Sequence, residues 1–317
     1  MKILLTGGTG LLGRNIIECL LEGNHEITLL LRDPTKYKKH DKKITKVKGD
    51  VLNLDSILDA IEKCECVIHA AADTSQHHLN ISDFKVNIQG TKNIVLACKK
   101  KNIKKLIHVG SAGFFGYGSK ENPGNENTTI KYPSNQSLYL MSKLHAQKEI
   151  TAYGKSNSVI TIHPTFMIGA HDYGPSSGKI ILMGMKKFVF CPPGGKNFVH
   201  VKDVANACIN AIESNNHVAN YIIGNKNLSY YEFFKLIQKE HNRNSIIIRI
   251  PSLVFYLMGL LGNIFRFLGF KTELSLTNMK ILMINNYFKN DKSLKELKLK
   301  YKPIEEAVKD AVNFFKI

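Results

Sequence analysis

Short apolar runs alternate with amphipathic stretches over the first half of the chain. Residues 3–5 form an apolar run of strand length, and apolar side chains then recur at helical spacing over 11–21. The same pattern predicts strands at 26–31, 45–48, 66–69, 105–109 and 159–163, and helices at 54–61, 86–98 and 138–153. Repeated strand–helix alternation predicts an α/β fold, in which a doubly wound parallel sheet carries helices on both faces.

A glycine cluster separates the first predicted strand from the first predicted helix. It satisfies two spacings, Gly8-x-Gly10-x-x-Gly13 and Gly7-x-x-Gly10-x-x-Gly13, that are typical of dinucleotide-binding turns. Glycine suits such a turn because a Cβ would hold the backbone away from a pyrophosphate, which the free N–H groups of the helix N-terminus would bind. The cluster therefore predicts a Rossmann-type nucleotide site, with an ordinary strand–helix turn as the simpler alternative.

The alternation stops after Pro164. Residues 169–195 are rich in glycine and proline, which favours a loop-rich insertion, and Phe198 to Ala205 indicates a return to the first domain. From about Leu228 the pattern is mostly helical and ends in an amphipathic helix over 304–315. We expect a dinucleotide-binding domain over 1–165, with 198–224 returning to it, and a smaller, mostly helical substrate lobe built from 166–197 and 225–317.

The composition is ordinary for a globular protein, with 44% hydrophobic and 22% charged residues among 317. The six cysteines form no CxxC pair, and only three apolar residues separate Lys2 from Thr6 and the glycine cluster. We therefore expect neither a disulfide framework nor a secretory leader, and a reducing, cytoplasmic location. No carboxylate or further histidine accompanies His77 and His78 at ligand spacing, so we expect a surface pair and no metal site.

The formal net charge of +18 could indicate a nucleic-acid or membrane partner. The lysines are scattered, however, and the longest run is only Lys99-Lys100-Lys101. No helix-turn-helix, zinc-finger or RRM-like pattern accompanies them. We therefore expect a lysine-rich solvated surface around an anion-binding enzyme, with a small-molecule substrate and no nucleic-acid partner.

Candidate chemistry is carried by three side chains. Ser111 follows a predicted strand, and Tyr139 and Lys143 stand four residues apart on one face of a predicted helix. A tyrosine has a pKa of about 10, too high for a base at neutral pH, but nearby cations lower it. Lys143 and an oxidised nicotinamide would be such cations, and Ser111 would hold the substrate oxygen. A Tyr-x-x-x-Lys pair alone is a weak signal, since such pairs occur by chance on many helices.

Several motifs strengthen this interpretation because they occur together and in order. They are Thr6-Gly-Gly-Thr-Gly-Leu-Leu-Gly13, Gly49-Asp50-Val51, His69-Ala-Ala-Ala72, Val86-Asn87-Ile-Gln-Gly-Thr91, Gly110-Ser111, Tyr139-x-x-x-Lys143 and His163-Pro164. The ordered set closely resembles the extended short-chain dehydrogenase/reductase superfamily, which includes the NAD-dependent epimerase/dehydratase family. Stretches 178–181, 198–204 and 221–225 are similar to the dihydroflavonol-reductase-like branch. That branch also holds hopanoid-associated sugar epimerase-like proteins and lies near the 3β-hydroxysteroid dehydrogenases.

The resemblance implies an NAD(P)-dependent oxidoreductase that transfers a hydride between its cofactor and a carbonyl or secondary alcohol. It implies that Ser111, Tyr139 and Lys143 form the catalytic trio, with Tyr139 as acid/base, and it alone suggests a homodimer. The cofactor-binding residues that we expect are Gly7, Thr9, Gly10, Leu11, Leu12, Gly13, Arg32, Asp50, Val51, Ala70, Ala71, Ala72, Asn87, Tyr139, Lys143 and Pro164.

The choice between NADP(H) and NAD(H) depends on the end of the second strand. NAD-specific folds place an acid there to bind the ribose 2′-OH, whereas this chain has Arg32, which can bind a 2′-phosphate through two hydrogen bonds. We therefore favour NADP(H) over NAD(H). In the alternative, Arg32 is solvated and Asp33 takes the ribose.

Two other functions are weighed against simple reduction. Nucleotide-sugar dehydratases of the superfamily carry an Asp-Glu pair where this chain has Ala112-Gly113, and sugar epimerases retain NAD, which Arg32 does not favour. A non-enzymatic NADP(H)-sensing module is disfavoured by the intact Ser111, Tyr139 and Lys143. No motif specifies the substrate, although Phe188, Phe190 and Pro192-Pro193 favour a small apolar or ring-containing molecule.

The most hydrophobic stretch runs from Ser252 to Phe265 within the segment 252–268. It is too short for a membrane span, and Arg266 interrupts it. We favour a buried helix or a lid over an apolar substrate. Contact with a membrane surface, with Arg249 and Lys271 at the flanks, is the less favoured alternative.

Overall fold

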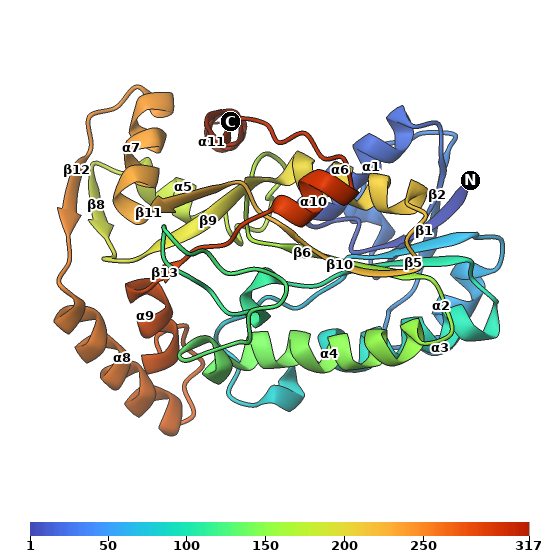
Figure 1. Cartoon of the computed structure of the whole chain (residues 1–317), viewed down its shortest axis with the longest axis horizontal. Helices are drawn as coiled ribbons and strands as arrows, with labels where there is room; N and C mark the ends of the chain where they lie inside the picture. Colours follow the sequence, from blue (N-terminus) through green and yellow to red (C-terminus); the bar gives the residue numbers. More distant parts are fainter. Residues whose placement is uncertain (317) are drawn as a thin grey trace.

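A computed structural model describes residues 1–316, and a parallel sheet of seven strands forms its centre (Figure 1). The strand order is β10-β6-β5-β4-β1-β2-β3. The strands are β1 (Lys2–Thr6), β2 (Glu26–Leu31), β3 (Ile44–Lys48), β4 (Cys66–His69), β5 (Lys105–Val109), β6 (Val159–Pro164) and β10 (Val218–Ile223). All six pairings are parallel, and the order reverses between β1 and β4, so ligands are expected beyond the carboxyl ends of these two strands.

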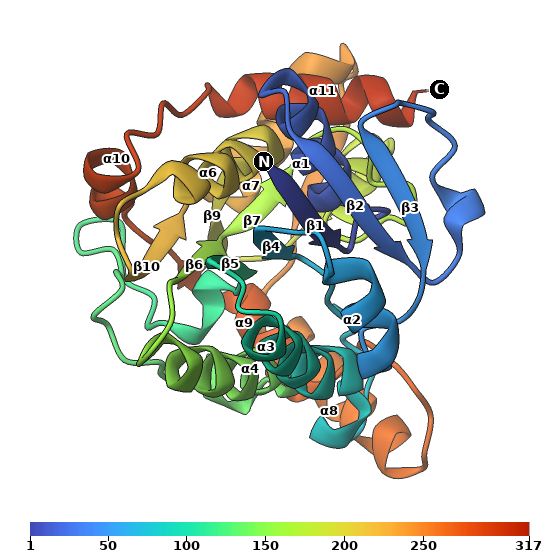
Figure 2. The ribbon, with the colours of Figure 1, turned by 90° about the vertical axis from the view of Figure 1, so that its right-hand side faces the viewer.

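Helices cover both faces of the sheet (Figure 2). One face carries α1 (Leu11–Glu22) and α6 (Val201–Glu213), which pack against each other, and the other carries α2 (Leu54–Ile61), α3 (Thr91–Lys100) and α4 (Leu138–Gly154). Each face buries its own cluster of aliphatic side chains. This three-layer arrangement confirms the predicted doubly wound α/β fold.

The predicted elements agree with the observed ones to within a residue at β2, β3, β4, β5 and α2. One difference bears on the site. The single helix expected over 86–98 begins instead as a π-helical turn, η3 (Val86–Gly90), before α3. Short 3₁₀ turns occur at Pro34–Lys36, Ile81–Asp83, Ala112–Phe114 and Ser134–Gln136.

A second lobe is built from chain segments on both sides of α6 and β10. Its helices are α5 (Lys179–Gly184), α7 (Tyr230–His241), α8 (Ser252–Phe267), α9 (Leu276–Met283), α10 (Asp291–Glu296) and α11 (Ile304–Phe315), although α10 packs beside β10. A small sheet joins β7 (Phe166–Ile168), β9 (Gly195–His200), β11 (Lys226–Ser229) and β13 (Asn285–Asn286), while β8 (Phe188–Cys191) pairs with β12 (Ile246–Arg249). The sequence pattern did not predict these two sheets, because their strands are short and several are polar.

Helix α8 differs from the expectation of a buried helix. Only Phe255, Gly259 and Gly262 of α8 are buried, and this seam faces α9. The chain just before α9 lies very close to α8, since a Cβ on Gly262 would lie 2.4 Å from the Leu274 carbonyl oxygen. Among residues 1–316, no helix has the length and apolarity that crossing a bilayer requires.

Candidate active site

Three side chains meet where β5 ends against the first turns of α4. Ser111 directly follows Gly110 at the end of β5, and the Lys143 ammonium donates a 2.8 Å hydrogen bond to the Val109 carbonyl oxygen. Tyr139 lies one turn before Lys143 on α4, and its hydroxyl lies near enough to the Ser111 side chain for the serine hydroxyl to affect its pKa. The structure therefore brings together the three residues that the sequence singled out.

The protonation state of Tyr139 is set mainly by its surroundings. Burial raises its pKa to about 12; the nearby Ser111 hydroxyl acts in the opposite direction, and the carboxylate of Asp73 adds to the rise. The pKa therefore shifts away from the direction expected from the neighbouring lysine. In the chain by itself, the phenol keeps its proton at neutral pH.

Lys143 is the principal charged group beneath the site. It is 3% exposed, and burial lowers its pKa to about 8. Three buried histidines lie on the adjacent strands, and burial together with the Lys143 charge lowers the pKa of both His69 and His163 to about 3 and that of His108 well below its usual value. The histidines are therefore neutral at physiological pH.

The Asn87 side chain is buried and holds two neighbouring segments together. Its buried amide accepts a hydrogen bond from the Asp73 N–H at 2.8 Å and donates to the Asp73 carbonyl oxygen at 2.9 Å and to the Ser142 hydroxyl at 2.8 Å. The π-helical turn η3 orients Asn87 toward both partners. Asn87 thus ties the loop after β4 to α4, a role that the expectation of direct cofactor contact did not include.

The glycine turn lies at the carboxyl end of β1, beside the loop after β4. Gly7 has a φ of 78°, and a Cβ there would lie 2.6 Å from the Ala71 nitrogen. A Cβ on Gly13 would lie 2.1 Å from the Gly7 carbonyl oxygen. Gly10 is exposed and caps α1 with no side-chain hydrogen bond, so the first N–H groups of α1 have no capping side chain. This is the geometry expected for binding a pyrophosphate.

The other residues expected to bind the cofactor lie along the same edge of the sheet. Asp50 and Val51 follow β3, and Ala70, Ala71 and Ala72 follow β4. Pro164 ends β6. Leu11 and Leu12 bury their side chains in the core, and Thr9 is half-buried. A nucleotide could therefore contact Leu11 and Leu12 only through their backbone groups.

The end of β2 carries Arg32, which is exposed. The adjacent Asp33 caps a short 3₁₀ turn, because its Oδ1 accepts hydrogen bonds from the Thr35 N–H at 3.0 Å and the Thr35 hydroxyl at 2.6 Å. Arg14, which the sequence analysis did not select, donates to the Lys36 carbonyl oxygen at 2.8 Å. Its position immediately after Gly13 was the feature of the sequence that could have indicated a place near the nucleotide. Arg14 is thus engaged by backbone carbonyl oxygens, and Asp33 by Thr35, whereas the structure gives Arg32 no hydrogen-bond partner among the described residues.

A cavity of about 110 Å³ lies beside Tyr139, between the sheet domain and helices α8 and α9. Most lining groups are polar: Ser75, Gln76, His78, Gln136, Ser137, Asn263, Arg266, Ser275, Thr277 and Asn278, with Phe84, Leu138 and Tyr139. Helix α8 contributes Asn263 and Arg266 to this wall. Its role as a lid over the substrate stays a prediction. Phe188 and Phe190, by contrast, are 49% and 57% exposed and do not line this cavity.

His78 and Arg266 are the residues of this cavity that sequence reasoning undervalued. His78 is half-buried, and its Nε2 lies 2.8 Å from Asp73 Oδ2. It is therefore not the free surface residue that the sequence predicts. Arg266 of α8 donates to the carbonyl oxygens of His78 and Thr272. A sequence separation of 188 residues between Arg266 and His78 left no local signal for this contact.

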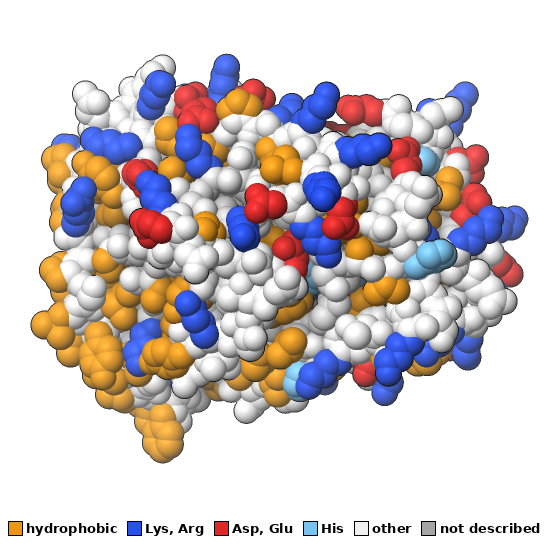
Figure 3. Space-filling view, in the orientation of Figure 1, with side chains coloured by type: hydrophobic (Ala, Val, Ile, Leu, Met, Phe, Trp, Pro, Cys, Tyr) orange, Lys and Arg blue, Asp and Glu red, His pale blue; other side chains and the backbone are white. Residues whose placement is uncertain are grey.

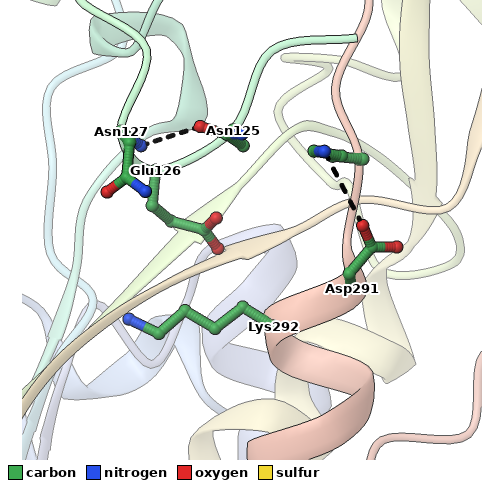
Figure 4. A pocket seen from close by; sticks show the side chains of 6 residues that line it. Asn125, Glu126, Asn127, Asp291 and Lys292 are labelled. Carbon is green, nitrogen blue, oxygen red and sulfur yellow. Dashed lines mark hydrogen bonds and ion pairs between the residues drawn. The ribbon is translucent and has the colours of Figure 1, made fainter. Parts of the chain in front are cut away.

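A larger recess of about 270 Å³ lies between the loop 125–127 and α10 (Figure 4). Its charged groups hold the edge strand β10, because Glu126 accepts from the Ile222 N–H at 2.8 Å and Lys292 donates to the Asn220 carbonyl oxygen at 3.0 Å. None of the predicted catalytic residues lines it. Among residues 1–316, no cluster of three His, Cys, Asp or Glu side chains could hold a metal ion.

Comparison with known proteins agrees with this geometry. Residues 3–224 match the model of the NAD dependent epimerase/dehydratase family. The chain is 26% identical over 306 residues to anthocyanidin reductase of Arabidopsis thaliana, covering 84% of this chain and 90% of the relative.

Two solved structures show the same fold over the whole chain. The crystal structure of gox2253 superimposes with a TM-score of 0.84 at 25% identity, over 99% of this chain and 97% of that one. The UDP-glucose 4-epimerase of Thermus thermophilus, solved in complex with NAD, superimposes with a TM-score of 0.78 at 18% identity, over 100% of this chain and 99% of that one.

Proposed function

The chain belongs to the NAD dependent epimerase/dehydratase family, and from this premise we propose that it is an NADP(H)-dependent oxidoreductase acting on a carbonyl or secondary alcohol. The observation that carries the proposal is the meeting of Ser111, Tyr139 and Lys143 at the end of β5, beside a polar cavity. The test is the consumption of NADPH, followed by its absorbance, in the presence of a panel of ketones, aldehydes and hydroxysteroids.

The backbone at the carboxyl edge of the sheet suits a dinucleotide. Gly7 and Gly13 leave no room for a Cβ, while the uncapped N-terminus of α1 offers N–H donors to phosphates. The nicotinamide of such a cofactor supplies the hydride-transfer chemistry. We propose that the predicted cofactor-binding residues contact the nucleotide along this edge, with Leu11 and Leu12 contributing backbone groups only.

The protein's own part in the reaction is to hold and move a proton. Ser111 would hydrogen-bond the substrate oxygen, and the Tyr139 hydroxyl would donate its proton to that oxygen during reduction. Lys143, fixed by the Val109 carbonyl oxygen, would provide positive charge beneath the phenol and favour the phenolate that remains. Asn87 would act as a positioning residue, since it ties the Asp73 loop to α4.

The raised pKa of Tyr139 gives the two directions of the reaction different pH dependence. Reduction needs the protonated phenol, which with a pKa of about 12 keeps its proton well above pH 8, so we expect kcat/KM for carbonyl reduction to be flat from about pH 6 to 8. Oxidation needs the phenolate, so its kcat/KM should rise with pH over the same range. Initial rates in both directions measure this. A reduction rate that rises with pH would contradict the assigned role of Tyr139.

Arg32 is proposed to favour NADP(H) by binding the 2′-phosphate. In Arg32→Glu, the added carboxylate would repel that phosphate and accept a hydrogen bond from a ribose 2′-OH. We expect kcat/KM for NADPH to fall by about thirtyfold or more and that for NADH to change by less than about threefold. Lys63→Glu, an equal charge change at an exposed position at the end of α2, should alter neither value. A tenfold preference of the unaltered protein for NADH would contradict the proposal.

Sugar epimerisation with retained NAD is the second candidate, because the fold is shared with a UDP-glucose 4-epimerase. Arg32 and the engaged Asp33 oxygen favour a dissociable NADP(H) instead. Release of the nucleotide from purified protein, measured by chromatography, distinguishes the two. Full occupancy by NAD would favour the epimerase.

The cavity lining modifies the expected substrate class. Amide, hydroxyl, imidazole and guanidinium groups surround the space beside Tyr139, whereas the aromatic residues that favoured an apolar substrate lie elsewhere. We therefore propose a ring-containing substrate that carries hydrogen-bonding groups near the reacting carbon. Within the panel, hydroxylated ketones should be better substrates than purely hydrocarbon ketones of equal size.

A further inference from the structure

The outer side of α8 is a broad, exposed hydrophobic surface. More than half of the exposed large hydrophobic side chains of residues 1–316 lie between residues 246 and 270. On α8 they are Leu253, Val254, Tyr256, Leu257, Met258, Leu260, Leu261, Ile264, Phe265 and Phe267, and Leu268 and Phe270 follow directly. Such a concentration on one element marks an interaction surface rather than ordinary scatter.

The two-stranded sheet β8–β12 extends this surface. Ile246 pairs with Phe188 and Ile248 pairs with Phe190 across the strands, and all four side chains are exposed. Since alternate residues of a strand share a face, the four form one apolar patch. Figure 3 shows hydrophobic side chains gathered at the left and lower left, where Figure 1 places β8, β12 and α8. We call the exposed apolar residues of α8, Leu268, Phe270 and the four strand residues together the apolar face.

Positive charges border the apolar face, and the chain segments that form it carry no acid. The exposed cations of these segments are Lys186, Lys187, Arg243 and Lys271. Arg249 is exposed as well, but it stacks on the Tyr231 ring and lies on the other face of β12 from Ile246 and Ile248. No Asp or Glu occurs between Asp172 and Asp203 or between Glu240 and Glu273. The combination of an apolar helical face with a cationic border complements a surface that offers both hydrocarbon and negative charge.

We propose that the apolar face docks on an anionic lipid bilayer, with α8 lying in the plane of the membrane interface. The 16 residues of α8 bury only the narrow seam toward α9, which leaves its opposite side free to enter the boundary between headgroups and acyl chains. The basic border would then lie at the level of the lipid phosphates.

The same charge pattern disfavours a second copy of the chain as the occupant. A two-fold dimer through the apolar face would bring one basic border against its symmetry copy. Like charges would then meet around an interface whose nearest exposed acid, Glu273, is already paired with Lys179. An anionic membrane places the opposite charge at that position.

Flotation with lipid vesicles tests the proposal, with the full chain and without any need for substrate. The unaltered protein should float with vesicles of phosphatidylcholine and phosphatidylglycerol in equal parts, and only weakly with phosphatidylcholine alone. Binding should weaken at high salt, because the cationic border contributes electrostatically. Replacement of Leu257 and Leu261, which are 50% and 57% exposed, by Asp should lower the bound-to-free ratio more than about tenfold.

A matched double variant controls for added charge. Leu96→Asp with Leu294→Asp places the same two carboxylates on exposed apolar positions of α3 and α10, outside the apolar face, and should bind vesicles as the unaltered protein does. Circular dichroism and thermal unfolding establish that both variants are folded.

Three results would overturn the proposal. The first is an unaltered protein that fails to float with anionic vesicles, and the second is an equal loss of binding in both double variants. The third is a concentration-dependent dimer in sedimentation velocity that Leu257→Asp with Leu261→Asp abolishes, without vesicle binding, since it would assign the apolar face to a second copy.

Discussion

Tyr139→Phe is expected to lower kcat for carbonyl reduction by about a thousandfold while leaving NADPH affinity within about twofold. The substitution removes the hydroxyl that lies near Ser111 and would donate the proton, but it keeps the aromatic ring beside Phe84. Steady-state kinetics measures the first effect, and fluorescence titration with NADPH measures the second. The size of the loss follows from removing the only proton donor assigned to the substrate oxygen.

Tyr153→Phe is the matched control on the same helix. Its hydroxyl is buried and has no hydrogen-bond partner among the described residues, so its removal should leave kcat unchanged and stability equal or higher. If Tyr139→Phe keeps more than about a tenth of the activity, Tyr139 is not the acid. The oxidoreductase proposal would then lose its central residue.

The second large effect is expected at the glycine turn. In Gly13→Ala the new Cβ would lie 2.1 Å from the Gly7 carbonyl oxygen, so the turn itself must move. We expect NADPH affinity to fall by about a hundredfold or more and the melting temperature to fall as well. Titration calorimetry and thermal unfolding measure the two quantities separately.

Gly10→Ala separates binding from stability at the same turn. Its new Cβ would lie 3.5 Å from the Gly7 carbonyl oxygen, an ordinary contact, and its φ of −81° suits alanine. The melting temperature should therefore stay unchanged, while a methyl group at the uncapped N-terminus of α1 should weaken NADPH binding by at least about tenfold. Unchanged NADPH affinity in Gly10→Ala would show that the phosphates do not lie against this turn.

The sheet domain was readable from sequence because its signals are local. Apolar strands such as Ile27 to Leu31 have strand length and end at turn residues, and the motif set follows the chain in order. The strands of the second lobe gave no such signal, since β11 reads Lys-Asn-Leu-Ser and β13 has two residues. The division of the chain into two domains at the expected boundaries stays a prediction.

The sequence predicted the reacting side chains of the site, but not the residues that position them or line the cavity. Ser111, Tyr139 and Lys143 stand in a recognisable spacing, but the partners of Asn87 depend on a π-helical turn that sequence periodicity does not reveal. The polar cavity is assembled from segments 190 residues apart, so its composition could not be inferred from the loop over 166–197. Whether the expected residues bind a nucleotide remains a prediction that the two glycine variants test.

The glycine seam between α8 and α9 has a consequence for how a substrate reaches Tyr139. Gly259 and Gly262 present bare backbone to α9, so few side chains interlock across the seam. On the inner side, Arg266 fastens α8 to the turn at Gln76 and His78. Asn278 of α9 donates to the same Gln76 carbonyl oxygen, so each helix of the seam holds this turn. A substrate would therefore reach Tyr139 past a wall that two donors, one on α8 and one on α9, keep in place.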